Sequence, residues 1–396
     1  MQATSGGTLK SLRRANSERL LALLLTRGPL HRAELARQAE LSRTTVSTII
    51  AELMDRGVVI EAESWPADLD GRAKETLVVN PDAGLILGMD FTFDRVWMHM
   101  TRLDGNEIAS EGARVPIGLG WNDRIDVATA LLDRIIDERG LDRRRILGAG
   151  IGVPAPVDKA TGHIEVALPG QPWSMVNAVE EFSRRFDLRL YIENSTRLEA
   201  VAEAHFGAGQ HIENLLYVAL SNGIGSGLII GGRVQSGAAG MAGELGHVSV
   251  DIDGPVCVCG NRGCLVLYAG IPAVLTSLRA QIGDSGTIAD VLERCAAGDR
   301  ACAGVLADAG QVTGRLLAGI CNLLNPQRIV VGGELSGAGE VLLAPMRDAI
   351  RRYALTPIRE VELLPAALDL GVRAGAVGGT ALVHGDTAAL ASMLVG

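Results

Sequence analysis

Apolar side chains recur at helical spacing through the first 60 residues, and short polar turns interrupt them. Leucines mark one face of a helix predicted over Asn16 to Thr26, and Gly28-Pro29 ends it. A second short helix is predicted over His31 to Gln38, and Ser42 is a favourable N-cap for a third helix over Arg43 to Arg56. The third helix would bury an apolar face made of Val46, Ile49, Ile50, Leu53 and Met54.

Polar side chains at the start of this third helix suit contacts with DNA. They are Ser42, Arg43, Thr44, Thr45, Ser47 and Thr48. Two short strands are predicted next, at Val58 to Glu61 and Thr76 to Val79, and the polar loop between them would bring Arg72 to a minor groove. The pattern predicts a winged helix-turn-helix domain whose recognition helix enters the major groove of double-stranded DNA.

Charge supports the DNA interpretation, and one turn residue fits it less well. Residues 1 to 60 hold nine basic and five acidic side chains, so they carry +4 in a chain whose net charge is −9. A basic head on an acidic body is typical of an appended phosphate-binding module. Glu40 stands at a turn position where glycine is usual, and a left-handed backbone there would cost roughly 1 kcal/mol. The alternative is a small helical bundle that serves as a dimerisation cap.

From residue 85 the pattern changes to strands that alternate with helices. The first half of this region predicts strands at 85–89, 95–103, 107–115, 146–153 and 190–193, with helices at 123–138 and 196–206. The second half predicts strands at 215–220, 228–234 and 328–331, a glycine-rich turn at 221–227, and helices at 272–280, 288–296, 303–324 and 374–383. Repetition of the theme predicts a two-lobed α/β body, with the last helix packed on the first lobe.

Composition agrees with such a body and argues against a membrane protein. The 396 residues allow two or three domains, and 47% hydrophobic content with 49 glycines suits an α/β fold with tight turns. The chain has no run of 18 apolar residues, and its N-terminus lacks the layout of a signal peptide. We therefore expect a cytoplasmic protein with no membrane partner.

One imidazole and three thiols predict a metal site in the second half of the chain. His247, Cys257, Cys259 and Cys264 match a closed, four-coordinate Cys3His site, and we expect one structural Zn²⁺ per chain. The alternatives are a disulfide or four unrelated core residues, but a C-x-C pair is too close for an easy bridge. The other cysteines, Cys295, Cys302 and Cys321, are expected to be buried free thiols.

The same stretch carries a resemblance to a known family. Glu244-Leu-Gly-His247 followed by C-x-C-G-x-x-G-C resembles the signature of the ROK family, which joins sugar-dependent repressors, open reading frames and sugar kinases. The segment 151–158 is similar to the family's G-x-P-G-P-x-D motif, with Ala155 at the second glycine. The resemblance implies that Asn194, Glu244 and His247 contact a sugar, and that His247 also ligates zinc.

The resemblance also implies an actin-like, sugar-kinase (ribonuclease H-like) body of two lobes. The domains would be a winged helix-turn-helix domain at 1–82, a first lobe at 83–194 plus 374–396, and a larger second lobe with the zinc site at 195–373. Two lobes imply a cleft between them, where an effector would bind.

Departures from the kinase pattern predict that the chain is not an enzyme. Where the family's kinases have Asp-x-Gly-Gly-Thr, this chain has Asp90-Phe91-Thr92-Phe93-Asp94, in which phenylalanine would fill space that phosphates require. The family's catalytic aspartate is replaced by Ser195, whose hydroxyl cannot act as a general base near neutral pH. Val266 replaces a glutamate of the sugar site.

We therefore expect a ROK-type transcriptional regulator of the repressor branch. It would bind a palindromic operator as a homodimer or tetramer, and a sugar or sugar-derived effector would close the cleft and release the DNA. Two alternatives stay open. One is a zinc-containing, ATP-dependent sugar kinase with an added DNA-binding domain, and the other is a regulator controlled by a protein partner in place of an effector.

Overall fold

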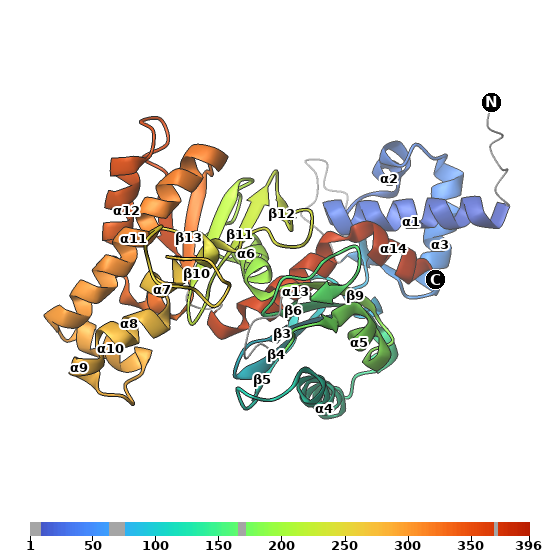
Figure 1. The fold of residues 1–396 in the computed structure, drawn as a ribbon. Coiled ribbons are helices and arrows are strands. Elements are labelled where there is room, and N and C mark those ends of the chain that lie inside the picture. Colours follow the sequence, from blue (N-terminus) through green and yellow to red (C-terminus); the bar gives the residue numbers. More distant parts are fainter. Residues whose placement is uncertain (1–8, 63–75, 165–171, 368–370) are drawn as a thin grey trace.

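The computed structural model describes residues 9–62, 76–164, 172–367 and 371–396, which form a small head on a two-lobed α/β body (Figure 1). The head holds α1 (Leu9–Arg27), α2 (Arg32–Gln38), α3 (Arg43–Asp55), β1 (Val59–Ala62) and β2 (Thr76–Val79). The two strands pair antiparallel, and Leu30 bridges to Leu77. The predicted helix order and paired strands are thereby confirmed, while Arg72 at the tip of the predicted wing lies outside the described residues.

The first lobe is built on a five-stranded sheet in the order β5-β4-β3-β6-β9. In this sheet β4 pairs antiparallel with both β3 and β5, whereas β3, β6 and β9 run parallel. Its elements are β3 (Leu85–Phe91), β4 (Arg95–Arg102), β5 (Glu107–Arg114), α4 (Trp121–Arg139), β6 (Ile146–Val153), β7 (His163–Ile164), β8 (Val176–Asn177), α5 (Ala178–Arg185) and β9 (Arg189–Asn194).

The second lobe repeats this plan with the strand order β12-β11-β10-β13-β14. It follows α6 (Ser195–Phe206), and its strands are β10 (Leu215–Leu220), β11 (Ile224–Ile230), β12 (Arg233–Gln235), β13 (Arg328–Gly332) and β14 (Glu362–Pro365). Its helices are α7 (Val266–Ala269), α8 (Ile271–Ser277), α9 (Arg279–Ile282), α10 (Ile288–Ala296), α11 (Arg300–Leu324) and α12 (Glu340–Tyr353). The chain ends in α13 (Ala374–Gly385) and α14 (Thr387–Val395).

Two adjacent element predictions in the second lobe are wrong. Residues 221–227, expected to be a glycine-rich turn, turn only as far as Gly223, and β11 begins at Ile224. The glycines serve helix packing, since a Cβ on Gly227 would lie 2.3 Å from the Ala200 methyl carbon on α6. The expected strand at 228–234 is instead the end of β11, a turn at Gly231-Gly232 and the start of β12.

The helix α13 lies on the first lobe's sheet, as expected, and its contact is very close. A Cβ on Gly150 of β6 would lie 2.2 Å from the carbonyl oxygen of Gly379. Glycine at these positions therefore lets the helix backbone lie directly on the strands. On its other side α13 packs along α6, so both helices stand between the lobes (Figure 1).

The last helix, α14, was not expected and belongs to the head. Its apolar residues Leu390, Ala391 and Leu394 share one buried core with Leu20 and Leu24 of α1. Figure 1 shows α14 alongside α1, at the opposite end of the sequence. The head is therefore a helical unit to which the C-terminus contributes.

Candidate functional site

The start of α3 presents the polar side chains that were predicted to read DNA. Ser42 caps the helix, because its Oγ accepts a hydrogen bond from the Thr45 backbone N–H at 3.1 Å. Arg43, Thr44, Ser47 and Thr48 are exposed, whereas Thr45 is half-buried. The opposite face buries Val46, Ile49, Ile50 and Leu53. The helix is thus held by its apolar face, and among the described residues its polar face is exposed.

The turn before α3 contains the backbone conformation that makes Glu40 unusual. Glu40 has φ of +52°, in the left-handed region that disfavours side chains with a Cβ. Its carboxylate lies 3.6 Å from the Arg19 guanidinium on α1. Both groups are well exposed, so this ion pair contributes little against the backbone cost.

Glu40→Gly is expected to stabilise the head by about 0.5–1 kcal/mol, because glycine adopts positive φ freely while its greater freedom in the unfolded chain offsets part of the gain. Hydrogen exchange of α2 and α3 amides in the full chain measures this. The matched control is Glu40→Ala, which removes the same ion pair but keeps a Cβ, and it should leave exchange nearly unchanged. Equal effects of the two substitutions would contradict the backbone explanation.

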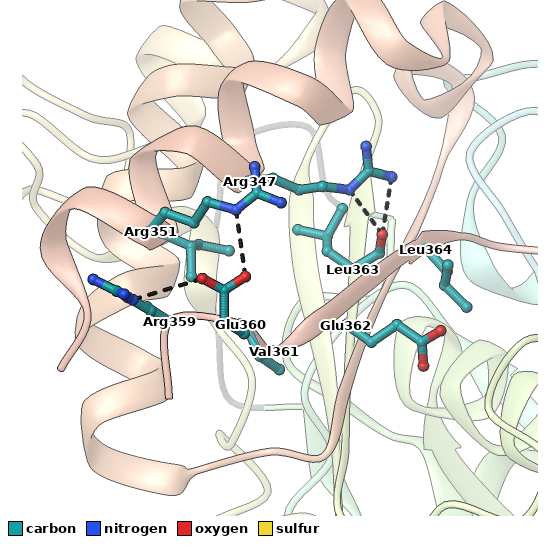
Figure 2. Close-up of a pocket in the computed structure, with 9 residues that line it drawn as sticks. Arg347, Arg351, Arg359, Glu360, Val361, Glu362, Leu363 and Leu364 are labelled. Atoms are coloured by element: carbon teal, nitrogen blue, oxygen red, sulfur yellow. Dashed lines mark hydrogen bonds and ion pairs between the residues drawn. The ribbon is translucent and has the colours of Figure 1, made fainter. Parts of the chain in front are cut away.

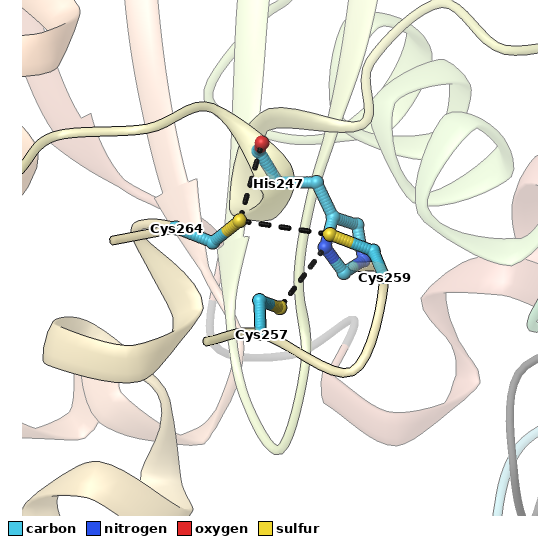
Figure 3. A group of neighbouring side chains, drawn as sticks. All are labelled: His247, Cys257, Cys259 and Cys264. Carbon is cyan, nitrogen blue, oxygen red and sulfur yellow. Dashed lines mark hydrogen bonds between the residues drawn. The ribbon is translucent and has the colours of Figure 1, made fainter. Parts of the chain in front are cut away.

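Three thiols and one imidazole meet in the loop that follows β12 (Figure 3). The ligand atoms of His247, Cys257, Cys259 and Cys264 all lie within 4.8 Å of one another, and the cysteines form no disulfide. Gly263 makes the fold of this loop possible: it has φ of +62°, and a Cβ there would lie 1.7 Å from the Asp251 carbonyl oxygen. The loop backbone therefore brings together side chains that are up to 17 residues apart.

The dimensions and chemistry of this cluster fit a tetrahedral metal ion. With Zn–S bonds of about 2.3 Å, a tetrahedron has edges of about 3.8 Å. Cys259 Sγ lies 3.7 Å from Cys264 Sγ, and Cys257 Sγ lies 3.7 Å from His247 Nδ1. Burial lowers the pKa of His247, which keeps the imidazole neutral as a ligand must be. Burial raises the pKa of Cys264 to about 12, and a bound cation would favour the thiolate that a zinc ligand must be.

The two other predicted ligand-binding residues lie between the lobes and differ in how they are used. Asn194 ends β9 and caps α6, because its Oδ1 accepts hydrogen bonds from Thr196 N at 2.9 Å and Arg197 N at 3.4 Å. Glu244 is half-buried, and no hydrogen bond joins its carboxylate to the described part of the chain. Burial raises its pKa. Glu244 is thus available to a ligand, while the Asn194 oxygen already serves the helix.

A buried ion pair beside these residues was missed by the sequence analysis. Glu193 and Arg197 are 0% and 1% exposed, and Arg197 Nε donates to Glu193 Oε1 at 2.6 Å. Arg197 also donates to the carbonyl oxygens of Ala242 at 2.6 Å and Gly240 at 3.0 Å. Arg197 therefore ties α6 to the loop that carries Glu244. A glutamate four residues before an arginine is common on exposed surfaces, so the sequence pattern alone did not show that Glu193 and Arg197 form a buried pair.

Glu193 collects further donors from both lobes. Its Oε2 accepts from Ser236 Oγ at 2.8 Å and lies 2.7 Å from Lys159 Nζ. Burial acts to raise the pKa of Glu193, but Arg197 and Lys159 outweigh it and hold the pKa below its usual value. The carboxylate is therefore ionised at neutral pH and joins the end of β9 to the loop after β12.

The residue at the kinase base position is engaged elsewhere. Ser195 Oγ donates to Asp90 Oδ1 at 2.6 Å, and both side chains are buried. Burial raises the pKa of Asp90 to about 6. The sequence analysis expected phenylalanine here to fill the space that phosphates require. Phe91 instead belongs to the first lobe's core, where its ring centroid lies 5.2 Å from that of Trp173. The missing glycines at Thr92 and Phe93 remain as departures from the kinase loop.

A cavity of about 300 Å³ lies elsewhere, between α12 and the edge strand β14 (Figure 2). None of its lining residues belongs to the predicted sites. Arg347 donates twice to the Leu363 carbonyl, and Arg351 and Arg359 both pair with Glu360. These cations are already satisfied, so the cavity is a feature of the sheet edge.

Comparisons with known proteins find matches for both the body and the head. A family model described as the ROK family matches residues 126–386. A second model, described as winged helix-turn-helix DNA-binding, matches residues 13–60. The putative xylose repressor of Caldicellulosiruptor sp. (strain Rt8B.4) is 30% identical over 389 residues, which cover 95% of this chain and 96% of that protein.

Two solved structures, a regulator and a kinase, differ in how much of this chain they match. A ROK family transcriptional regulator, a homologue of the E. coli Mlc protein, is 25% identical with a TM-score of 0.79 and covers 97% of this chain and 98% of its own. A ROK family glucokinase from Streptomyces griseus is 26% identical with a TM-score of 0.66, and it covers 99% of its own length but 76% of this chain. Among the described helices, none combines the length and apolar character that crossing a membrane requires.

Proposed function

The chain belongs to the ROK family, and on that premise we propose that it represses transcription of carbohydrate-related genes in response to a sugar or sugar-derived effector. The observation that carries the proposal is the helix α3, which is anchored by its apolar face and exposes Arg43, Thr44, Ser47 and Thr48. Polar side chains on the first turns of such a helix contact base edges in the major groove. Binding to DNA makes the cytoplasm its place of action.

A palindromic operator requires two heads, so the proposed active form is a homodimer or a higher oligomer. Within each chain, Glu244, His247 and the amide nitrogen of Asn194, whose oxygen caps α6, would bind the effector between the lobes. Glu244 supports this role because its half-buried carboxylate makes no hydrogen bond to the described residues. Zn²⁺ held by His247 and the three cysteines would fix the loop from which Glu244 projects, and its role would be structural.

The kinase alternative is disfavoured by the same residues. A phosphoryl-transfer site needs a carboxylate to accept the sugar hydroxyl's proton and small residues around the phosphates. Ser195 cannot accept that proton and is bonded to Asp90 instead. The glucokinase likeness concerns the body, whereas the regulator likeness spans nearly the whole chain.

Arg43→Ala is expected to weaken operator binding roughly 10-fold or more, because a side chain in the major groove contributes about 1–3 kcal/mol. Fluorescence polarisation with a duplex from the region upstream of the gene, at two salt concentrations, measures this. The matched control is Arg144→Ala, which removes a 90% exposed arginine from the body. Equal affinity of Arg43→Ala and the unaltered protein would contradict the assignment of α3 as the recognition helix.

D-Xylose is chosen as the first probe because a relative is named a putative xylose repressor, and it is expected to raise the thermal midpoint by binding beside Glu244. A ligand at 100 times its dissociation constant adds about 2.7 kcal/mol. Thermal-shift measurements with D-xylose and D-glucose test this, and Glu244→Gln should abolish any shift. A shift that survives Glu244→Gln would exclude the proposed site, and silence with every sugar would favour control by a protein partner.

A further inference from the structure

The strand β9 connects the proposed effector site with the DNA-binding head. Its C-terminal end carries Glu193 and Asn194, described above. Three residues before Asn194, Tyr191 packs against the apolar cluster that the head shares with the first lobe, α13 and α14. The Tyr191 hydroxyl donates to Asp386 Oδ2 at 2.9 Å and accepts from Arg189 Nε at 2.8 Å. A single strand therefore reaches both places.

Asp386 is the residue at which α13 ends and α14 begins. Its Oδ1 accepts from the Ala389 backbone N–H at 3.1 Å, so it caps α14. Its Oδ2 holds Tyr191, and Arg189 lies 3.6 Å from the same oxygen. One carboxylate thus caps α14 with one oxygen and binds Arg189 and Tyr191, in the first half of β9, with the other.

Hydrogen bonds along α14 then tie it to the DNA-binding helices. Thr387 Oγ1 lies 3.3 Å from Thr26 Oγ1 at the end of α1, and Ser392 Oγ donates to Glu18 at 3.0 Å. Arg56, directly after the recognition helix, donates to the Leu394 carbonyl at 3.0 Å. A shift or rotation of α14 would therefore move α1 and the end of α3 with it.

We propose that the Tyr191–Asp386 hydrogen bond is the joint through which the effector site controls the orientation of the DNA-binding head. The proposal rests on the proposed function, because it concerns how the state of the cleft reaches the operator-binding helices. An effector that draws the end of β9 toward Glu244 moves Tyr191, and Asp386 passes this movement to α14. The helix α13 ends at the same Asp386, so a movement of α13 would reach α14 at this residue too.

The experiment is a double-mutant cycle read by hydrogen exchange of the amides of α14 in the full-length, zinc-loaded protein. Asn194→Ala perturbs the site by removing the cap of α6. It is expected to speed exchange in α14 roughly threefold. Tyr191→Phe keeps the ring and removes only the hydroxyl. In this background, Asn194→Ala should speed exchange in α14 by less than about half as much.

The matched control is Asn177→Ala, which removes an equivalent cap from α5 in the same lobe, where Asn177 Oδ1 accepts from Glu180 N at 3.0 Å. It should leave α14 unchanged. No effect of Asn194→Ala on α14, or an equal effect in both backgrounds, would overturn the joint. If Asn194→Ala does not fold, Ser236→Ala, which removes the 2.8 Å hydrogen bond to Glu193 at the C-terminal end of β9, replaces it as the perturbation, with the same expected outcomes. DNA affinity is measured separately, so a protein that fails to bind DNA refutes the proposed function without deciding the exchange result.

Discussion

Cys259→Ser is expected to lower the thermal midpoint by roughly 10 °C and to release the metal. Serine is a poor zinc ligand, and because metal binding is coupled to folding, loss of one thiolate would cost about 3–5 kcal/mol of stability in the second lobe. The loop from Val248 to Cys264 would lose its order first, since few apolar side chains hold it: Ile252, Val256 and Val258 are exposed. Calorimetry and elemental analysis of the purified protein measure the two effects.

The control for this prediction is Cys295→Ser, which alters a half-buried thiol outside the cluster. It should retain one zinc per chain and shift the midpoint by only a few degrees. A chelator should bring the unaltered protein to the stability of Cys259→Ser. A protein that is isolated without metal and is fully stable would show that the four side chains are not a zinc site.

Arg197→Ala is expected to destabilise the protein by about 3–5 kcal/mol, because it leaves the Glu193 carboxylate buried beside a single, half-exposed Lys159. It also leaves the carbonyl oxygens of Gly240 and Ala242 without their donor. Urea unfolding at pH 7 measures the loss. Arg197→Lys keeps the charge but cannot supply the three directed hydrogen bonds, and we expect it to recover only part of the stability.

The pH dependence distinguishes this ion pair from simple packing. The folded-state pKa of Glu193 is lowered, so its contribution is present above the unfolded value near 4.5 and is lost as the pH falls through the folded pKa. In Arg197→Ala, only Lys159 still opposes the effect of burial, so the pKa of Glu193 rises. Because Glu193 then binds a proton more readily in the folded state, part of the lost stability should return as the pH falls toward 5. A loss that is constant from pH 5 to 8 would mean that packing alone is responsible.

Local patterns predicted several elements to the residue. The strands 146–153 and 215–220 and the helix 288–296 match β6, β10 and α10. These segments have clear periodicity or an unbroken apolar run, and polar or glycine residues at their ends stop them. The Ser42 cap was also predicted, because an N-cap depends only on the three residues that follow it.

Other elements were missed where tertiary packing overrides local preference. Residues 224–227 are rich in glycine and were taken as a turn, yet they form β11 because α6 requires a surface without side chains. The helices α5, α12 and α14 were not predicted. For α14, the run Ala388 to Leu394 is apolar on most sides, and its partners lie more than 300 residues earlier.

The His247 and cysteine cluster and the polar start of α3 could be found from spacing, because metal binding and DNA reading require such residue types close together in sequence. The Glu193–Arg197 pair could not, since only burial between the lobes distinguishes it from an ordinary surface pair. Asn194 was predicted as a ligand, and the structure shows that its oxygen caps α6.

By itself, the sequence determined the family, the helix-turn-helix head, the grouping of His247 with three cysteines, and the serine in place of the kinase base. Each of these depends on side-chain identity over a short span. Only the tertiary structure decided that the C-terminal helix completes the head, that Ser195 binds Asp90, and that Arg197 holds the Glu244 loop. These contacts join residues far apart in the chain, and whether they form depends on the packing of whole elements, which no local pattern encodes.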